Sequence, residues 1–156
     1  MQSENAKRLL SDCEFALQMM EDSENLQLRR ILWVSMMAML RTIADTLDRD
    51  PNKKVRQAYQ KARKSWEQER TGSALIFFEF IVHERNNIIH EWSFGHSDDE
   101  DMNLAFMSEN SELEVADLTD IYWPMVSGPF SGTDARDVAH EAINWWRHEL
   151  KKMEIS

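Results

Sequence analysis

Apolar residues recur at steps of three and four positions along most of this chain, a spacing that places them on one side of an α-helix. Turn residues interrupt this repeat at a few places, most clearly at Pro51, Gly72 and Gly132. The pattern predicts five helices, over about residues 3–21, 25–49, 53–72 and 73–94 and from 134 onward. The sequence therefore predicts an all-α bundle of about five helices.

The predicted helices differ in how their apolar residues are distributed. The second, residues 25–49, is apolar nearly all round, which indicates a central helix or one half of an interface. The third has a narrow apolar stripe with basic residues on its other side. Its stripe is formed by Val55, Tyr59, Ala62 and Trp66.

Residues at the helix ends predict local backbone structure. Pro51 suits a first helical position, Gly95 suits the left-handed position that ends a helix, and Thr133 suits an N-cap. Between Gly95 and Gly132 we expect no helix, and the segments LEVADL and IYWPMV could be short strands or extended segments packed on the bundle. So long a connection in a compact domain is often functional or mobile.

Length and composition indicate one domain over residues 1–156. Cys13 is the only cysteine, so no intrachain disulfide can form, and a reducing compartment is favoured. Residues 1–8 lack the apolar run of a signal peptide, and the longest apolar stretch, residues 31–40, is half of a membrane span. We therefore expect a cytoplasmic protein with no membrane association.

Charge is unevenly distributed along the chain. The net charge is -10, which disfavours unspecific binding of polyanions. Residues 49–70 nevertheless hold eight Lys or Arg against three acids, a local balance of +5, while residues 91–134 hold eleven acids and no Lys or Arg. We expect a basic helix and an acidic segment, and residues 98–120 could screen that helix until a substrate or partner arrives; a merely solvated acidic surface is the alternative.

The stretch HERNNIIHEW, residues 83–92, concentrates polar side chains on a helix that is otherwise apolar. An unpaired buried amide or imidazole costs about 1–3 kcal/mol, so this composition calls for an explanation. On a helical period one stripe contains His83, Asn86, Asn87 and His90. Arg85 lies about 140° from His90 on an ideal helix. Either the stripe carries chemistry, or it makes structural hydrogen bonds.

These residue types suit chemistry on a phosphodiester. A histidine with an unperturbed pKa of about 6.5 can take or give a proton at neutral pH. A guanidinium can hold two phosphate oxygens and neutralise developing charge, and an asparagine can orient an imidazole or bind an oxygen. A zinc-protease motif fails, because Asn87 and Asn144 stand where HERNN and HEAIN would need a second histidine. We expect no metal site and no cofactor.

Arg85, Asn86, three further residues and then His90 resemble the motif of the HEPN superfamily (higher eukaryotes and prokaryotes nucleotide-binding domain), which has Arg, a polar residue that is often Asn, and His after four to six intervening residues. The position near the end of a long penultimate helix is also similar. The resemblance implies an HEPN-like bundle and a metal-independent endoribonuclease that acts as a homodimer. Its composite site would form where the motif helices of two subunits face each other.

The resemblance also implies roles for individual residues. RNA would be cleaved by attack of its 2′-hydroxyl on the adjacent phosphorus, with His90 in proton transfer, Arg85 in charge stabilisation and Asn86 in positioning. His83 and Asn87 would help to bind substrate, and the third helix could provide a backbone track from Lys53, Lys54, Arg56, Lys61, Arg63 and Lys64.

The biological setting would be defence, a toxin–antitoxin pair or RNA turnover, with a regulatory protein as a further partner. Toxins of the HEPN and nucleotidyltransferase pairs usually carry a modifiable tyrosine two residues after the histidine; here Trp92 stands there, so that regulation is not expected. The alternatives are a catalytically silent HEPN-like dimeric binding or regulatory module, and a helical adaptor unrelated to nucleotides.

Overall fold

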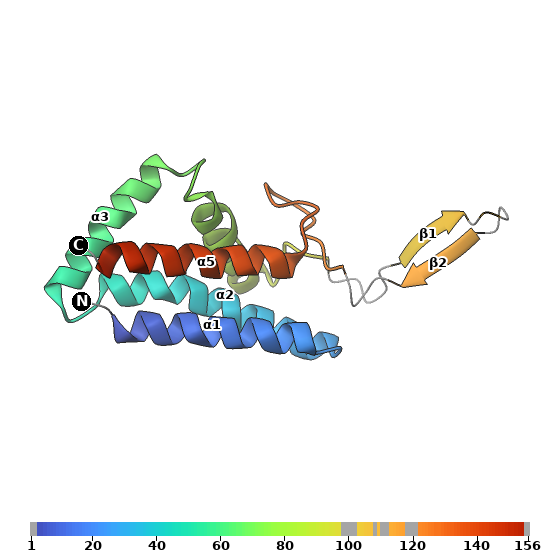
Figure 1. The fold of residues 1–156 in the computed structure, drawn as a ribbon, viewed down its shortest axis with the longest axis horizontal. Coiled ribbons are helices and arrows are strands. Elements are labelled where there is room, and N and C mark those ends of the chain that lie inside the picture. Colours follow the sequence, from blue (N-terminus) through green and yellow to red (C-terminus); the bar gives the residue numbers. More distant parts are fainter. Residues whose placement is uncertain (1–2, 98–102, 108, 110–112, 118–121, 155–156) are drawn as a thin grey trace.

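The computed structural model of the 156-residue chain describes residues 3–97, 103–107, 109, 113–117 and 122–154. Within these ranges it has five α-helices, one π-helix and one pair of strands. The predicted helical architecture is confirmed, and the bundle itself consists of helices only (Figure 1). None of the described helices combines the length and apolar character needed to cross a membrane.

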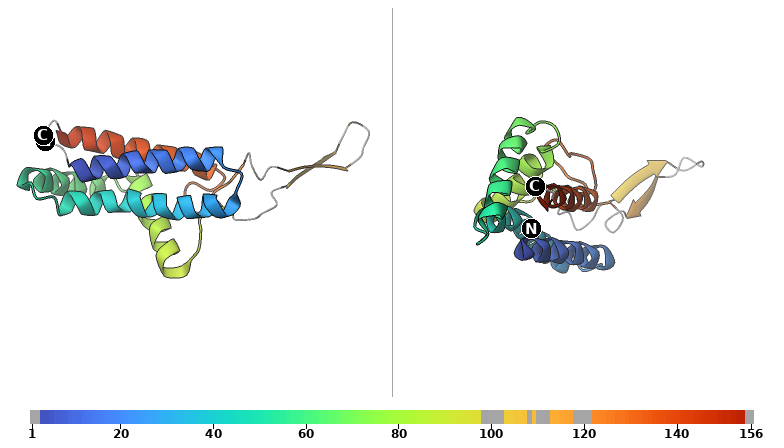
Figure 2. Two further views of the ribbon diagram at one scale, coloured as in Figure 1. Left: turned by 90° about the horizontal axis from the view of Figure 1, so that it is seen from below. Right: turned by 60° about the vertical axis from the view of Figure 1, so that its left-hand side comes forward.

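Three long helices form the body of the molecule. They are α1 (Glu4–Asp22), α2 (Leu26–Asp48) and α5 (Ala135–Glu154), and they lie side by side along the long axis (Figures 1 and 2). The first two begin at side-chain caps: Ser3 Oγ accepts from the Ala6 N–H at 3.4 Å, and Asn25 Oδ1 accepts from the Leu28 N–H at 2.9 Å.

Helix α2 is central, as its nearly continuous apolar character predicts. Its buried face contributes Trp33, Met36, Met37, Leu40, Ile43 and Leu47 to the core. Trp146 of α5 packs here as well, and its indole N–H donates to the Leu40 carbonyl at 3.0 Å. Large apolar side chains thus join α2 to its neighbours, since burial of such groups drives packing.

Helix α3 (Lys53–Gln68) leaves the direction of the other three (Figure 1). The expectation that Pro51 occupies the first helical position is wrong, because Asn52 is the N-cap and its side chain accepts from the Lys54 N–H at 3.0 Å. An asparagine can satisfy an N–H at a helix start, which proline cannot do. The predicted stripe is otherwise confirmed, with Val55, Tyr59 and Trp66 buried.

The fourth predicted helix is a composite of π-helix η1 (Phe77–Val82) and α4 (His83–Glu91). Four of the first five residues of η1 are buried, namely Phe77, Phe78, Phe80 and Ile81. In η1 the i→i+5 bonds of a π-helix replace the i→i+4 bonds of an α-helix, and this interruption lies directly before α4. The buried side chains of η1 anchor the composite helix in the core.

Helix α4 ends in a different way from that predicted. Its left-handed terminal residue is Trp92, with φ 49°, and Gly95 does not have a positive φ. Gly95 is needed for another reason: a Cβ there would lie 2.5 Å from Oε2 of Glu84. The glycine thus serves close approach rather than left-handed conformation.

The connection between α4 and α5 contains an antiparallel hairpin of β1 (Asn103–Met107) and β2 (Leu113–Asp117), in a register that pairs Asn103 with Asp117 and Met107 with Leu113. The hairpin stands apart from the helices in Figures 1 and 2. LEVADL is therefore a strand over its first five residues, while the described part of IYWPMV, residues 122–126, has isolated bridges at Pro124 and Met125. The acidic residues 98–101 lie outside the described residues, so the screening hypothesis stays a prediction.

Candidate functional site

Helix α4 extends outward from the three long helices, as the yellow-green helix in the left view of Figure 2 shows. It is held by one side only, where Glu84 and Ile88 are buried. On its other side His83 and His90 are exposed, and Asn86 and Asn87 are half-buried. The polar stripe predicted from the sequence thus lies at the surface of the protomer, where water removes the desolvation cost of burying it.

Two of the motif residues, Arg85 and Asn86, are in contact on this helix. Arg85 is half-buried, and its Nη1 donates to Oδ1 of Asn86 at 3.1 Å. A guanidinium has five N–H donors, and this bond uses one of them. The contact fixes the positive group beside the amide and leaves donors that can hold an anionic oxygen.

Glu84 anchors the inner side of the helix and was not predicted from the sequence. It is 2 % exposed, and Oε1 accepts from the Trp33 indole N–H of α2 at 3.1 Å. The Gly95 N–H lies 3.0 Å from each carboxylate oxygen. A signal was present, because Glu84 is four residues before Ile88 and shares its apolar face.

The environment of Glu84 affects its ionisation. Burial raises the pKa of this carboxyl, while the hydrogen bonds from Gly95 and Trp33 favour the charged form and oppose the rise. A buried carboxylate with three N–H···O contacts ties together α2, α4 and the segment after α4. It therefore fixes the rotation of α4 and, through that rotation, the direction in which the polar stripe faces.

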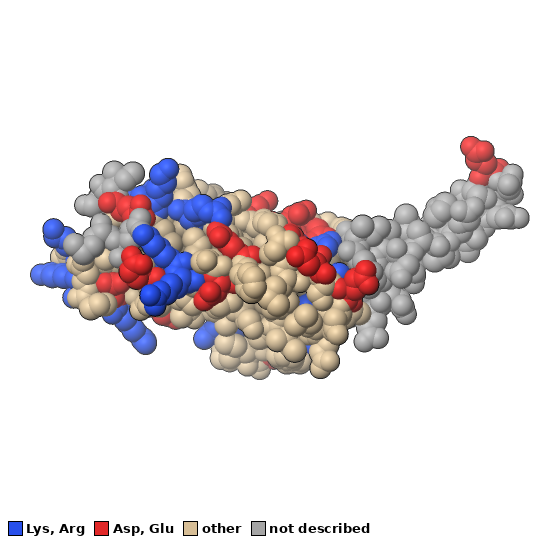
Figure 3. All heavy atoms as spheres, turned by 60° about the horizontal axis from the view of Figure 1, so that its bottom comes forward, with Lys and Arg blue, Asp and Glu red and all other residues tan. Residues whose placement is uncertain are grey.

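The basic residues of α3 lie elsewhere. Helix α3 packs on α2 and α5, at the end of the bundle where both chain termini lie (Figure 1). In Figure 3 many Lys and Arg side chains gather toward this end, with acidic groups interspersed. Within one protomer the structure thus does not bring the α3 track to the α4 stripe.

The six basic residues of α3 that were predicted to contact the RNA backbone also differ in their exposure and in their contacts within the chain. Four of them are exposed, namely Lys53, Lys54, Lys61 and Lys64. Arg56 donates to the Asp50 and Pro51 carbonyls, at 2.5 and 3.0 Å. Arg63 pairs with Glu67 at 3.1 Å and lies over the Phe78 ring. The two arginines stabilise the fold locally, and the lysines are the better candidates for contact with a polyanion.

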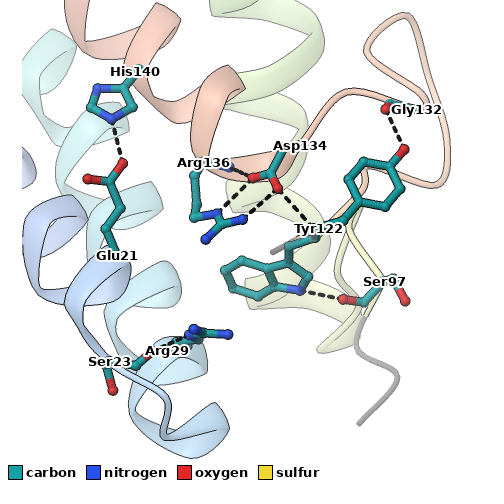
Figure 4. A network of polar contacts seen from close by, with 10 residues as sticks. Glu21, Ser23, Arg29, Ser97, Tyr122, Gly132, Asp134, Arg136 and His140 are labelled. Carbon is teal, nitrogen blue, oxygen red and sulfur yellow. Dashed lines mark hydrogen bonds and ion pairs between the residues drawn. The ribbon is translucent and has the colours of Figure 1, made fainter. Parts of the chain in front are cut away.

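A second polar cluster lies at the start of α5 (Figure 4). The predicted cap Thr133 is wrong, because Asp134 caps the helix and accepts from the Arg136 N–H at 2.9 Å. Its carboxylate also accepts from the Trp123 N–H at 2.9 Å and pairs with Arg136 at 2.7 Å. Burial alone would raise the pKa of Asp134, but hydrogen bonds from Arg136 and Trp123 outweigh it and lower the pKa.

An open pocket of about 590 Å³ adjoins this cluster, lined by Glu21, Tyr122, Gly132, Thr133, Asp134, Arg136 and Asp137. Several of its polar groups are occupied by one another or by neighbours: Tyr122 donates to the Gly132 carbonyl at 2.7 Å, and Glu21 lies 2.6 Å from Nε2 of His140. These contacts fix the chain as it enters α5. We therefore interpret the cluster as structural.

Two further observations concern nucleophilic and metal-ligating side chains. Cys13 is buried, and burial raises its pKa to about 12, so its thiol is protonated and unsuited to nucleophilic attack. Among the described residues, no three His, Cys, Asp or Glu side chains are grouped as a metal site would need. The stripe on α4 is thus the cluster best suited to chemistry in the described part of the chain.

Comparison with known proteins finds no family model, no curated protein and no solved structure that matches this chain significantly.

Proposed function

We propose that this protein is an endoribonuclease of HEPN type whose active site forms between the α4 helices of two copies. The observation that carries the proposal is the outward stripe of α4, where His83 and His90 are exposed and Asn86 accepts from the adjacent Arg85. The helix projects from the bundle, so both RNA and a second copy can reach the stripe (Figure 2).

The chemistry follows from these side chains. His90 of one copy takes the proton of an RNA 2′-hydroxyl, and the oxygen attacks the adjacent phosphorus. The bond from phosphorus to the 5′-oxygen breaks, and His90 of the second copy gives that oxygen a proton. Arg85 stabilises the charge on the non-bridging oxygens, and Asn86 holds the guanidinium in place. The products are a 2′,3′-cyclic phosphate and a 5′-hydroxyl.

The length of α4 favours two copies over one. His83 and His90 are seven residues apart, which is about 10 Å along a helix that rises about 1.5 Å per residue. Within one copy the two imidazoles would have to bend toward each other along the helix to meet one phosphate, so two facing helices supply the acid and the base more directly. Ile89, next to His90 and 54 % exposed, would be covered by the second copy.

The test is cleavage of mixed cellular RNA by purified protein in EDTA. We expect wild type to leave cyclic phosphate ends, and Arg85→Ala and His90→Ala to abolish cleavage at unchanged fold and mass. His148→Ala is the matched control, because His148 is exposed on α5, away from the stripe. Equal cleavage by wild type and both motif variants would refute the assignment, and a strictly monomeric protein would remove the composite site.

The second candidate is a catalytically silent, dimeric HEPN-like binding or regulatory module. The net charge of -10 favours it, since such a charge slows encounter with a polyanion. Intact RNA after incubation with wild type at low salt, together with retained dimerisation, would support this alternative. A role in defence, as a toxin or in RNA turnover belongs to the first candidate.

A further inference from the structure

Trp92 combines two unusual properties. It is 62 % exposed, and it is the one described residue other than glycine with a positive φ. A left-handed conformation costs a residue with a Cβ about 1–2 kcal/mol, and glycine would avoid that cost. A large aromatic residue at this strained, exposed position gains little from burial, and such outliers gather at functional sites.

The indole is nevertheless held in place. The ring meets Phe94 edge to face with centroids 5.3 Å apart, while the backbone N–H of Trp92 donates to the Ile88 carbonyl at 3.1 Å and closes the helix end. Phe94 in turn lies 5.3 Å from the buried His96 ring. The indole thus has one aromatic neighbour, which itself packs against a buried ring, while most of the Trp92 side chain faces solvent.

We propose that Trp92 stacks on an unpaired base of single-stranded RNA whose phosphate lies on Arg85 and His90, an inference that rests on the proposed function. Trp92 leaves the helical conformation at the end of α4, two residues after His90, so a strand that crosses this helix end can bring a base to the ring and its phosphate to the imidazole. Aromatic side chains bind single strands in this way because every base has a π-face.

The surroundings favour a nucleotide over a protein partner. The exposed residues next to Trp92 along the chain, Glu91 and Ser93, are polar, whereas protein interfaces have depleted charge at their core. Arg85 contributes a permanent positive charge, and the carboxylate of Glu84 is turned inward to Trp33 and Gly95. Glu91 is the exposed acid of α4, and it would weaken the binding of an anion.

Stacking defines the substrate class. A base paired within a duplex shows its edges but not its faces, so Trp92 selects single strands, loops or ends. The site would thus recognise unpaired bases without preference for a base sequence, because stacking tolerates all four bases.

The experiment measures binding of a single-stranded, 2′-O-methylated RNA that cannot be cleaved, beside the same strand in a duplex. Trp92→Ala should weaken single-strand binding by roughly 5- to 150-fold, Trp92→Phe should keep most of it, and the duplex should bind weakly throughout. Glu91→Gln should strengthen binding. The matched control is Phe15→Ala, since Phe15 is 67 % exposed on α1 and outside the site.

Each contrary outcome has a distinct meaning. Unchanged binding by Trp92→Ala, or no binding by wild type, overturns the inference, and the cleavage assay then decides the proposed function by itself. A shift of Trp92→Ala from dimer to monomer by sedimentation also overturns it, since the indole would then face a second copy. Weakened binding with no cleavage by wild type would support stacking and refute the ribonuclease.

Discussion

Replacing Glu84 by alanine tests whether one buried carboxylate positions the candidate site. The change removes the acceptor of the Trp33 indole N–H and of the Gly95 N–H, both of which are buried. An unpaired buried donor costs about 1–3 kcal/mol, so two cost about 2–6 kcal/mol. Since a domain of this kind is stable by about 5–15 kcal/mol, the loss is a large share of its stability.

The assay is urea unfolding followed by circular dichroism, with hydrogen exchange to locate the effect. We expect the midpoint to fall, and the amides of α4 to lose protection before those of α2, because α4 is held by one side only. Glu79→Ala is the matched control, since Glu79 is exposed in the adjoining π-helix and should change stability by less than about 0.5 kcal/mol. If Glu84→Ala were no more destabilising than Glu79→Ala, the anchoring role would be refuted.

The same carboxylate has a pH signature. Burial raises its pKa above the ordinary value of 4.5, so between the two values the folded chain binds more protons than the unfolded chain. This contribution to stability is present at acid pH and is lost as pH rises from about 4.5 through the folded pKa. The Glu84→Gln variant lacks this pH-dependent contribution, so its free energy of unfolding should rise relative to that of wild type as pH increases through this window. A difference that does not vary between about pH 4 and 8 would contradict the raised pKa.

Three further outcomes can be measured on the same protein. Gly95→Ala should cost about 1–3 kcal/mol in urea unfolding, because its Cβ would lie 2.5 Å from the Glu84 carboxylate and 2.9 Å from a methionine methyl. Gly72→Ala is the control: its nearest contact is an exposed glutamate at 3.0 Å, so it should change stability by less than about 0.5 kcal/mol. Equal effects of the two substitutions would contradict the steric argument. Cys13, buried and with a pKa of about 12, should react with a thiol reagent at pH 8 only as fast as the protein opens, so labelling of the native protein as fast as in urea would contradict its burial. Trp92→Gly should change the free energy of unfolding by less than about 1 kcal/mol, because relief of the left-handed strain offsets the lost ring contact, and a loss above about 2 kcal/mol would mean that the indole is structural.

The helices that the sequence predicted well are those with both a clear stripe and a good cap. Helices α1 and α2 follow Ser3 and Asn25, and their bounds agree with the prediction within a few residues. The π-helix could not be predicted, because apolar spacing does not reveal the width of a turn. The contacts of Phe77 at the start of η1 are likewise tertiary, since the centroids of the Trp66 and Trp145 rings lie 5.1 and 5.4 Å from its own.

At the candidate site, too, the sequence predicted the local arrangement of side chains but not their tertiary contacts. Spacing placed His83, Asn86 and His90 on one stripe, and the structure has all three on the outer side of α4. Periodicity cannot say whether that side is covered by the rest of the chain, whereas the structure has His83 and His90 exposed. The left-handed end was assigned to Gly95 by the general preference for glycine, whereas close approach to Glu84 decides what that glycine does.

Glu84 and Arg85 are adjacent in sequence and about 100° apart around one short helix, Glu84 buried and Arg85 half-buried, so fold and chemistry are coupled there. The inner residue meets Trp33 and Gly95, and its contacts determine which way the outer residues point. Variants of Arg85 or His90 should therefore lose activity and keep stability, because these side chains lie at the surface or half-buried. Variants of Glu84 should lose both, since a helix that can rotate or fray no longer presents a fixed guanidinium and imidazole to a phosphate.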